Sequence, residues 1–363
     1  MKIKDLCSYA PKSRIKAGEA VENAKYLFFT SSADENKRYT DFQFDKEAII
    51  MGTGGNATLH YYNGKFSVST DCLVLFPNSK IKCKYLYYFF KSHMSVLEAG
   101  FKGAGLKHTN KKYIEEINVS KVPDLSTQEK IVSHLDTITE NIEKLNRELE
   151  LFDSLTKARF IEMFGEPVNN DKGWVKDSVE RLCREIYGGG TPSKSHPEYY
   201  EGGEIPWITS KDMKADILKD SQIHINEDGV ANSTARIVPK NSVIMVIRSG
   251  ILKHTLPVAI NAVPITVNQD LKVFIPGNRI VTKFLAYQFK MMERNILSGV
   301  RAVTADNIEF DALKRRELIV PPIELQQEFA DFVQQVDKSR EEVKKSLEKT
   351  QQLYDSLMQE YFG

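Results

Sequence analysis

Residues 122–165, VPDLSTQEKIVSHLDTITENIEKLNRELELFDSLTKARFIEMFG, are the stretch that decides the fold. Apolar side chains recur here at alternating steps of four and three residues, the heptad spacing of a helix that buries one narrow stripe. Ser126 with Glu129 three residues later predicts a capping box at the helix start. A stripe this narrow needs a partner helix. Its members are Ile131, Leu135, Ile138, Ile142, Leu145, Leu149 and Phe152.

Residues 320–363 repeat this pattern, because a Val-Pro pair again precedes a heptad stripe and a Phe-Gly pair again closes it. Arg340 and Thr350 interrupt the second stripe, and polar residues at such positions commonly fix the register of paired helices. Each helix would span about 39 residues, or roughly 58 Å. We expect the two to pair within the chain as an antiparallel coiled coil; a generic coiled-coil dimer is the alternative. The second stripe comprises Phe329, Val333, Val336, Val343, Leu347, Tyr354, Leu357 and Tyr361.

The repeat extends upstream of both helices. Residues 69–77 (STDCLVLFP) match residues 268–276 (NQDLKVFIP), and residues 84–91 match residues 283–290, both at an offset of 199. A unit of this length is far too long for a solenoid repeat. The chain is therefore predicted to be an internal duplication with pseudo-twofold character. Its predicted parts are a first globular domain at 1–121, a first helix at 122–165, a second globular domain at 166–319 and a second helix at 320–363.

Each globular unit is predicted to be mixed α/β, with short strands and helices in the same unit. We therefore expect the fold class α+β. Runs rich in β-branched and aromatic residues predict strands, and a helix with an aromatic face is predicted at residues 84–92 and again at 283–291. The predicted strands lie at 48–51, 73–76, 243–247, 258–260 and 271–275.

The net charge of +1 hides an uneven distribution. Residues 1–120 contain 18 Lys and Arg against 12 Asp and Glu, and residues 166–320 contain 21 against 19. The two helical segments, 121–165 and 321–363, contain 6 against 9 and 5 against 9. Basic globular units favour a polyanion as partner and acidic helices favour a protein, although an ordinary solvated surface is the alternative.

Other classes of site and location are disfavoured. The four cysteines form no CxxC pair and the seven histidines show no metal-binding spacing, so we expect neither a disulfide scaffold nor a zinc site. The glycine-rich residues 101–105 and 188–194 lack the companion motifs of an adenine methyltransferase or a P-loop. No apolar run is long enough to cross a bilayer, and the N-terminal residues lack the apolar core of a signal peptide. We therefore expect a cytoplasmic protein without catalytic residues.

Basic, hydroxyl and amide side chains in loops are the candidates for contact with nucleic acid, because they can reach phosphates and base edges. For each of them, a solvated surface residue is the alternative interpretation. In the first unit the candidates are Lys107, His108, Thr109 and Asn110; in the second they are Thr191, Lys194, Ser210, Lys211, Arg248, Ser249, Lys253, Arg301 and Thr304.

These features together resemble the DNA-specificity (S) subunit of type I restriction-modification systems, over essentially the whole chain. The resemblance rests on two predicted helix starts, in which a proline is followed a few residues later by a glutamine-containing string, QEKIV at 128–132 and QQEF at 326–329. It rests further on FGEP at 164–167, GTP at 190–192 and GEIPWI at 203–208. In such subunits each globular unit is a target recognition domain that reads half of a split double-stranded DNA site. The helices set the gap between the halves and dock methyltransferase subunits.

The resemblance implies a non-catalytic subunit that binds no cofactor itself. Its partners would be double-stranded DNA, two methyltransferase subunits that use S-adenosylmethionine, and a restriction-translocase subunit. One departure is that the shorter first unit shows no counterpart of residues 203–208, so its fold or its reading of DNA is expected to differ. The alternative function is a two-headed protein-binding scaffold with a coiled-coil rod; a steep loss of DNA affinity with salt would argue against it.

Overall fold

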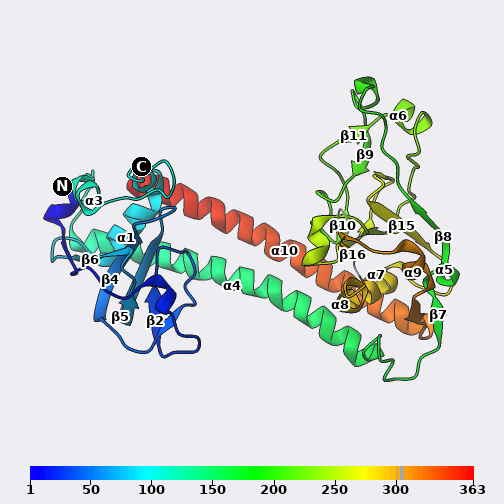
Figure 1. Ribbon diagram of the computed structural model, residues 1–363, viewed down its shortest axis with the longest axis horizontal. Helices are drawn as coiled ribbons and strands as arrows, with labels where there is room; N and C mark the ends of the chain where they lie inside the picture. The colour runs from blue at the N-terminus through cyan, green and yellow to red at the C-terminus, as the bar shows by residue number, and fades with distance from the viewer. Residues whose placement is uncertain (300, 303–305) are drawn as a thin grey trace. The chain divides into compact units, whose positions relative to one another are not determined.

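The computed structural model describes residues 1–299, 301–302 and 306–363. It divides into two compact units, Met1–Arg147 with Lys344–Gly363, and Glu148–Val343. The two long helices, α4 (Leu125–Phe164) and α10 (Ile323–Phe362), each contribute to both units (Figure 1). The order of globular part, helix, globular part, helix confirms the predicted α+β fold with its internal repeat.

The first unit is built on a six-stranded sheet in the order β1-β6-β4-β5-β2-β3. Strand β2 runs parallel to β5, and the remaining neighbours are antiparallel. The strands are β1 (Cys7–Tyr9), β2 (Tyr26–Phe29), β3 (Arg38–Tyr39), β4 (Phe44–Gly52), β5 (Leu59–Val68) and β6 (Cys72–Pro77). The shorter helical elements are η1 (Ile3–Asp5), η2 (Ala17–Glu19), α1 (Cys83–Ser92), α2 (Met94–Ala99) and α3 (Lys111–Glu116).

The two faces of this sheet belong to separate cores, because successive residues of a strand point to opposite faces. Ile49 of β4 packs under α1, whereas its neighbours Ala48 and Ile50 pack on the other face with Phe29 and Phe66. The core under α1 also holds residues from the start of α4 and the end of α10. These are Ile131, Leu135, Tyr354, Met358 and Phe362.

The second unit contains a five-stranded sheet, β10-β13-β12-β15-β8, and a three-stranded sheet, β11-β9-β14. Two further strand pairs, β16-β17 and β18-β7, complete it. The strands are β7 (Lys176–Ser178), β8 (Cys183–Gly188), β9 (Ile205–Ile208), β10 (Ile217–Leu218), β11 (His224–Ile225), β12 (Val243–Val246), β13 (Val258–Asn261), β14 (Thr266–Val267), β15 (Leu271–Pro276), β16 (Arg301–Ala302), β17 (Asp306–Asn307) and β18 (Glu317–Ile319). The helices are α5 (Val179–Leu182), η3 (Pro197–Tyr199), α6 (Glu227–Ala231), η4 (Gly250–Lys253), α7 (Thr282–Met291), α8 (Glu293–Leu297) and α9 (Phe310–Arg315).

An aromatic cluster joins the long helices to the second unit. Phe164 at the end of α4 contacts Phe284 of α7 with ring centroids 4.8 Å apart, and Phe160 contacts Phe329 near the start of α10 at 5.4 Å. The end of α4 therefore packs with the start of α10 here, whereas the start of α4 shares a core with the end of α10 in the first unit. The two helices consequently run antiparallel.

Every residue predicted for the two apolar stripes is buried or half-buried. Arg340, one of the two polar residues that interrupt the second stripe, donates to the Asp153 carboxylate of α4 at 2.6 Å. Burial along α4 continues beyond the predicted stripe to Phe160 and Phe164. The buried stripe residues are Ile131, Leu135, Phe329, Val333, Val336 and Tyr354, and the half-buried ones are Ile138, Ile142, Leu145, Leu149, Phe152, Val343, Leu347, Leu357 and Tyr361.

The start of α4 differs from the prediction. Asp124 is the capping residue, because its carboxylate accepts from the Thr127 backbone N–H at 3.0 Å and from the Thr127 hydroxyl at 2.6 Å. Glu129 instead lies 3.7 Å from the Lys82 ammonium. The predicted capping box of Ser126 and Glu129 is therefore wrong, since the helix begins two residues earlier than that motif requires.

A fully buried glutamine ties the first sheet to α4. The Gln128 side chain donates to the Pro123 carbonyl at 2.7 Å and to the Lys80 carbonyl at 3.3 Å, and it accepts from the Lys82 N–H at 2.7 Å. It thereby satisfies backbone groups on both the helix start and the loop before α1. Nearby, the Lys84 ammonium of α1 pairs with Asp136 of α4 at 2.7 Å.

Gln326 does the same in the second unit. Its side chain donates to the Pro321 carbonyl at 2.8 Å and to the Arg279 carbonyl at 3.1 Å, and it accepts from the Val281 N–H at 2.9 Å. An ion pair between the Lys283 ammonium and Asp337 at 2.9 Å again accompanies it. The duplication therefore repeats the attachment of each sheet to its helix, bond for bond.

The strand pairing shows that the first unit contains a counterpart of strand β9, which comparison of the sequences alone did not reveal. Phe28 of β2 lies opposite Ser67 of β5, and Trp207 of β9 lies opposite Thr266 of β14, with both pairings parallel. Ser67 and Thr266 are related by the same offset of 199 as the rest of the repeat. The expectation that the first unit lacks a counterpart of residues 203–208 is therefore wrong. The two strands share only apolar character, and their equivalence becomes visible only through strand pairing.

Candidate functional site

In the first unit, two loops meet at the backbone carbonyl of Asp71, just before β6. Thr53, directly after β4, donates its N–H to this oxygen at 2.8 Å and its hydroxyl at 3.0 Å. Ser31, which follows β2, donates its hydroxyl to the same oxygen at 2.7 Å. One carbonyl thus fixes the β2–β3 and β4–β5 loops against each other.

A third segment, the hairpin before α3, joins these loops. Lys102 and His108 exchange two backbone hydrogen bonds, at 2.9 and 3.0 Å, which close the hairpin. Gly55 donates to the Lys107 carbonyl at 2.9 Å, and Thr109 donates to the Thr53 carbonyl at 3.0 Å. We call the resulting surface the first loop cluster and define it as residues 30–37, 53–58, 69–71 and 101–109.

The second unit repeats this arrangement. Ile247, directly after β12, donates its N–H to the Asp270 carbonyl at 2.9 Å, and Ile308 donates to the Ile247 carbonyl at 2.8 Å. Asp270 lies 199 residues after Asp71, and Ile308 lies 199 residues after Thr109. The second loop cluster comprises residues 209–216, 247–257, 268–270, 301–302 and 306–308. Two surfaces of equivalent backbone construction therefore exist, one in each unit.

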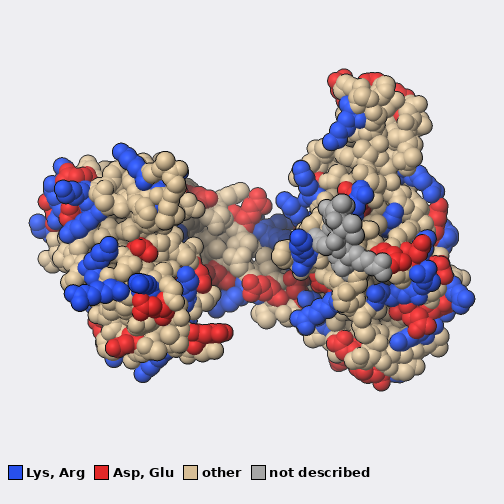
Figure 2. Space-filling view, in the orientation of Figure 1, with Lys and Arg blue, Asp and Glu red and all other residues tan. Residues whose placement is uncertain are grey.

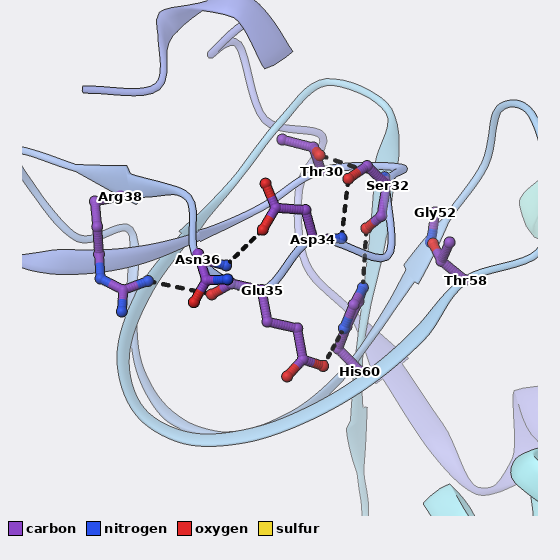
Figure 3. Close-up of polar contacts among 9 residues, drawn as sticks. All are labelled: Thr30, Ser32, Asp34, Glu35, Asn36, Arg38, Gly52, Thr58 and His60. Atoms are coloured by element: carbon purple, nitrogen blue, oxygen red, sulfur yellow. Dashed lines mark hydrogen bonds and ion pairs between the residues drawn. The ribbon is translucent and has the colours of Figure 1, made fainter. Parts of the chain in front are cut away.

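Figure 3 shows the β2–β3 loop of the first loop cluster. Its polar side chains hold its own backbone: Ser32 accepts from the Asp34 N–H at 3.0 Å, and Asp34 accepts from the Asn36 N–H at 2.9 Å. The Arg38 guanidinium donates to the Glu35 carbonyl at 3.1 Å. Such side-chain turns give a short loop a defined path without secondary structure.

His60 of β5 anchors this loop from below (Figure 3). Its ring is 4% exposed, packs on Phe29 with centroids 5.2 Å apart, and places Nε2 3.3 Å from the Ser32 carbonyl. Its Nδ1 lies 2.8 Å from the Glu35 carboxylate, and the Glu35 side chain is 68% exposed. An exposed carboxylate held in this way can accept a hydrogen bond from a cytosine amino group.

The first-unit candidates divide into two kinds. Lys107 and His108 are exposed on the hairpin, where they can contact a ligand. Thr109 is 8% exposed, and the Asn110 side chain caps α3 by accepting from the Tyr113 N–H at 3.0 Å. Thr109 therefore has a structural role in the first loop cluster, and Asn110 has one at the start of α3.

Arg248, Ser249 and Lys253 lie together in the β12–β13 loop of the second loop cluster. Arg248 is exposed and pairs with the Asp270 carboxylate at 2.6 Å, while Ser249 caps η4 by accepting from the Ile251 N–H at 3.4 Å. Lys253 is exposed at the end of η4. This loop is longer than its counterpart in the first unit, so it carries more of the candidates.

The other second-unit candidates lie around this group. The Thr191 hydroxyl donates to the Gln269 side chain beside Asp270, and Lys194 is exposed on the loop before η3. Ser210 and Lys211 follow β9, at the position that Ser31 and Ser32 occupy after β2. Arg301 is in β16, where only its backbone is described, and Thr304 lies outside the described residues.

The glycine-rich loop after β8 has a packing role. A Cβ atom at Gly189 would lie 1.9 Å from the Val267 carbonyl oxygen, so only glycine allows the chain to cross β14 at this point. The next residue, Gly190, donates to the same carbonyl at 2.9 Å and accepts from the Trp207 indole N–H at 3.0 Å. These glycines join the five-stranded sheet to the three-stranded one.

The thiols offer no nucleophile at neutral pH. All four cysteines are buried and unpaired, and burial raises the pKa of Cys72 to about 11 and that of Cys7 and Cys183 to about 12. Within residues 1–299, 301–302 and 306–363, no group of three His, Cys, Asp or Glu side chains is arranged to hold a metal ion. None of the helices in that part of the chain combines the length and apolarity of a membrane span.

Sequence reasoning missed the residues that build the loop clusters. Ser31, Thr53 and Glu35 carried no motif, and Asp71 acts through its backbone carbonyl rather than its side chain. One signal was available, because Asp71 and Asp270 are identical within the matching segments of the repeat. On the face drawn in Figure 2, basic and acidic side chains are intermixed.

The family model of the type I restriction modification DNA specificity domain matches residues 1–151 and 172–352. The chain belongs to this family. Each of the two matched stretches contains one loop cluster. The relatives are named specificity subunits, which are non-catalytic components of type I restriction-modification complexes.

Individual specificity subunits agree with this assignment. The specificity subunit of the type I restriction enzyme EcoR124I/EcoR124II of Escherichia coli is 28% identical over 316 residues, covering 83% of this chain and 76% of that protein. The MjaIX specificity subunit of Methanocaldococcus jannaschii is 31% identical over 196 residues, covering 53% of this chain and 44% of that protein. Both similarities are to proteins of the same family.

Solved structures show the same fold. The S subunit of a type I restriction-modification system from M. genitalium aligns with a TM-score of 0.70 at 15% identity, covering 99% of this chain and 94% of that one. A chain from a study of complex assembly and conformational transition of the type I R-M system aligns with a TM-score of 0.55 at 15% identity, covering 100% and 96%. At this identity the likeness concerns the fold alone.

Proposed function

We propose that this specificity subunit recognises double-stranded DNA within a type I restriction-modification complex, each loop cluster reading one half of a split site. The observation that carries the proposal is the equivalence of the two clusters, each assembled on an aspartate carbonyl at the same place in the repeat. Two similar readers on one chain suit a site of two halves. Exposed side chains that differ between the clusters, such as His108 and Arg248, would give the halves different sequences.

The attachment of each sheet to its helix supports a fixed gap between the halves. Gln128 and Gln326 are fully buried and fill three hydrogen-bonding positions each. A recognition unit held in this way has little freedom to turn on its own helix. The distance between the two DNA halves would then be a property of the helices.

The helices also suit protein docking. Outside the buried stripes, α4 and α10 present polar and charged residues with an acidic excess, which disfavours contact with phosphates and favours a protein surface. We assign this surface to two methyltransferase subunits, with a restriction-translocase subunit completing the complex. S-adenosylmethionine would be used by the methyltransferases and not by this chain, and the complex would act in the cytoplasm.

The proposal is tested by purifying the chain with its methyltransferase subunits and mapping the methylated adenines in DNA exposed to the complex. We expect a motif of two short halves with a fixed gap, methylated only when this chain is present. Methylation that ignores sequence would overturn the proposal. Complex formation without any DNA binding at low salt would instead favour a two-headed protein scaffold.

A further inference from the structure

Two lysine side chains contact the Phe310 ring in the second unit, and Arg248 belongs to the same charged group. The Lys272 ammonium of β15 lies 4.6 Å from the centre of the Phe310 ring, and the Lys314 ammonium of α9 lies 4.5 Å from it. Arg248 is the third member, because it pairs with Asp270, two residues before Lys272, at 2.6 Å, and its charge acts on Lys272 together with that of Lys314. The three come from separate elements that the fold brings together.

Two of the three cations have a carboxylate partner. Arg248 pairs with Asp270 at 2.6 Å, and Lys314 pairs with Asp311 at 2.9 Å. Lys272 has no carboxylate within 4.0 Å among the side chains that the structure describes. Among the described side chains, the half-buried Lys272 ammonium is therefore without an ion-pair partner, beside two other cations.

The fold makes room for this ammonium. Lys272 lies opposite Gly188 on the neighbouring strand β8, and a Cβ atom at position 188 would approach the Lys272 Nζ to 2.4 Å. Burial, and then the charges of Lys314 and Arg248, lower the pKa of Lys272. A bound anion would relieve the repulsion among the three cations.

The group borders the second loop cluster, because the Arg248 N–H donates to the Asp270 carbonyl at 3.3 Å. The first unit has different residues at the corresponding positions. At the offset of 199, Leu73 replaces Lys272, and Lys111 and Glu115 replace Phe310 and Lys314. Lys111 and Glu115 lie 3.5 Å apart as an ion pair of their own.

We propose that Arg248, Lys272 and Lys314 form a phosphate-binding site that holds one backbone phosphate of DNA against the second loop cluster, without a counterpart in the first. This inference rests on the proposed function and adds a contact to it. Lysine and arginine bind phosphates through charge and hydrogen bonds without reading sequence. The site would therefore fix the position of the duplex on the second unit.

The test is the salt dependence of DNA binding by the full chain, measured by fluorescence anisotropy with a short duplex of random sequence. Each phosphate neutralised contributes about 0.9 to the slope of log K against log salt concentration. The variant K272Q/K314Q should lower the steepness of that slope by about this amount. K272R should retain the wild-type slope because it keeps the charge.

A matched control is K240Q, because Lys240 is exposed before β12, at the end of that strand away from the loop cluster. The slope of K240Q should equal that of the wild type. If the double variant unfolds, K314Q alone can be measured instead, and its slope should also be less steep than that of the wild type. An unchanged slope in folded K272Q/K314Q and K314Q, or an equal fall in K240Q, would overturn the phosphate site. Failure of the wild-type chain to bind DNA at low salt even when combined with its methyltransferase subunits would overturn the proposed function itself.

Discussion

The first and second units share an equivalent backbone arrangement, which we call the frame, and differ in the side chains of their loops. Gln128 and Gln326 make equivalent bonds, as do the carbonyls of Asp71 and Asp270, although few other residues in these regions are identical. The frame is thus maintained largely by backbone groups and by two buried amides. Loop side chains can change on such a frame without altering where the loops lie, which suits a protein whose task is to distinguish sequences.

The surfaces differ most in the connections that follow β2 and β9. In the first unit a short loop joins β2 to β3 and is anchored by His60. In the second unit the corresponding segment contains the extra strand β10, and η4 lengthens the β12–β13 loop. The second unit therefore offers a larger loop surface on the same frame.

The largest effect should come from removing a ring of the aromatic cluster in the second unit. Phe284→Ala deletes a fully buried side chain that contacts Phe160 and Phe164, so we expect it to cost about 3–5 kcal/mol of unfolding free energy. Denaturant unfolding followed by hydrogen exchange should locate the loss in the second unit. Leu151→Ala on the exposed side of α4 is the control, with an expected change within about 0.5 kcal/mol. An equal loss of unfolding free energy in both units would contradict the division of the chain into two compact units.

Removing the buried amides tests whether the frames are equivalent. Gln128→Ala and Gln326→Ala should each cost about 1–3 kcal/mol, because buried backbone groups lose their partners. The exposed Gln327, which donates to Asp331 at 2.9 Å, provides the control Gln327→Ala with little expected change. Unfolding free energies measured in denaturant decide the point. A large cost at one glutamine and none at the other would show that the two attachments are not equivalent.

Single changes in one loop cluster should alter only one half of the DNA site. Glu35→Gln replaces an exposed acceptor carboxylate with an amide, so we expect a change of about 1–2 kcal/mol in the preference at one half-site. Mapping of methylated adenines with the variant complex measures this preference. The other half-site should keep its sequence. A change at both halves, or at neither, would remove Glu35 from the interface.

Alkaline conditions should weaken the first unit before the second. Burial raises the pKa of Cys72 to about 11 and that of Cys7 and Cys183 to about 12, whereas an unfolded thiol titrates near about 8.5. The stabilising contribution of a buried neutral thiol is therefore complete below the unfolded pKa and is lost as pH rises towards the folded one. The first unit contains three buried cysteines and the second only Cys183.

At a pH of about 9.5 we expect a loss of about 1 kcal/mol for each buried thiol, since one pKa unit corresponds to about 1.4 kcal/mol. Hydrogen exchange measured at several pH values can follow each unit separately. The variant Cys72→Ala should reduce the alkaline loss in the first unit only. An identical pH response in both units would show that the thiols do not govern it.

The sequence predicted the helices better than the loops, for physical reasons. A heptad stripe records burial directly, so residues 131–152 predicted the paired part of α4. The predicted stripe ended too early, at Phe152, because Phe160 and Phe164 enter the core of the second unit, where a wider face of the helix is buried. Polar character, in contrast, does not separate a capping residue such as Asn110 from an exposed candidate such as Lys107. The role of Asp71 lies in its backbone carbonyl, which no side-chain pattern reveals.

The most direct test of the account replaces residues 1–121 with a second copy of residues 166–319, so that both loop clusters come from the second unit. The chimera is combined with the methyltransferase subunits, and methylated adenines are mapped. Because the frames are equivalent and the helices antiparallel, we predict an inverted repeat of the second half-site with the original gap. A complex that assembles normally and still methylates the wild-type motif, or none, would contradict the claim that each loop cluster reads one half of the site.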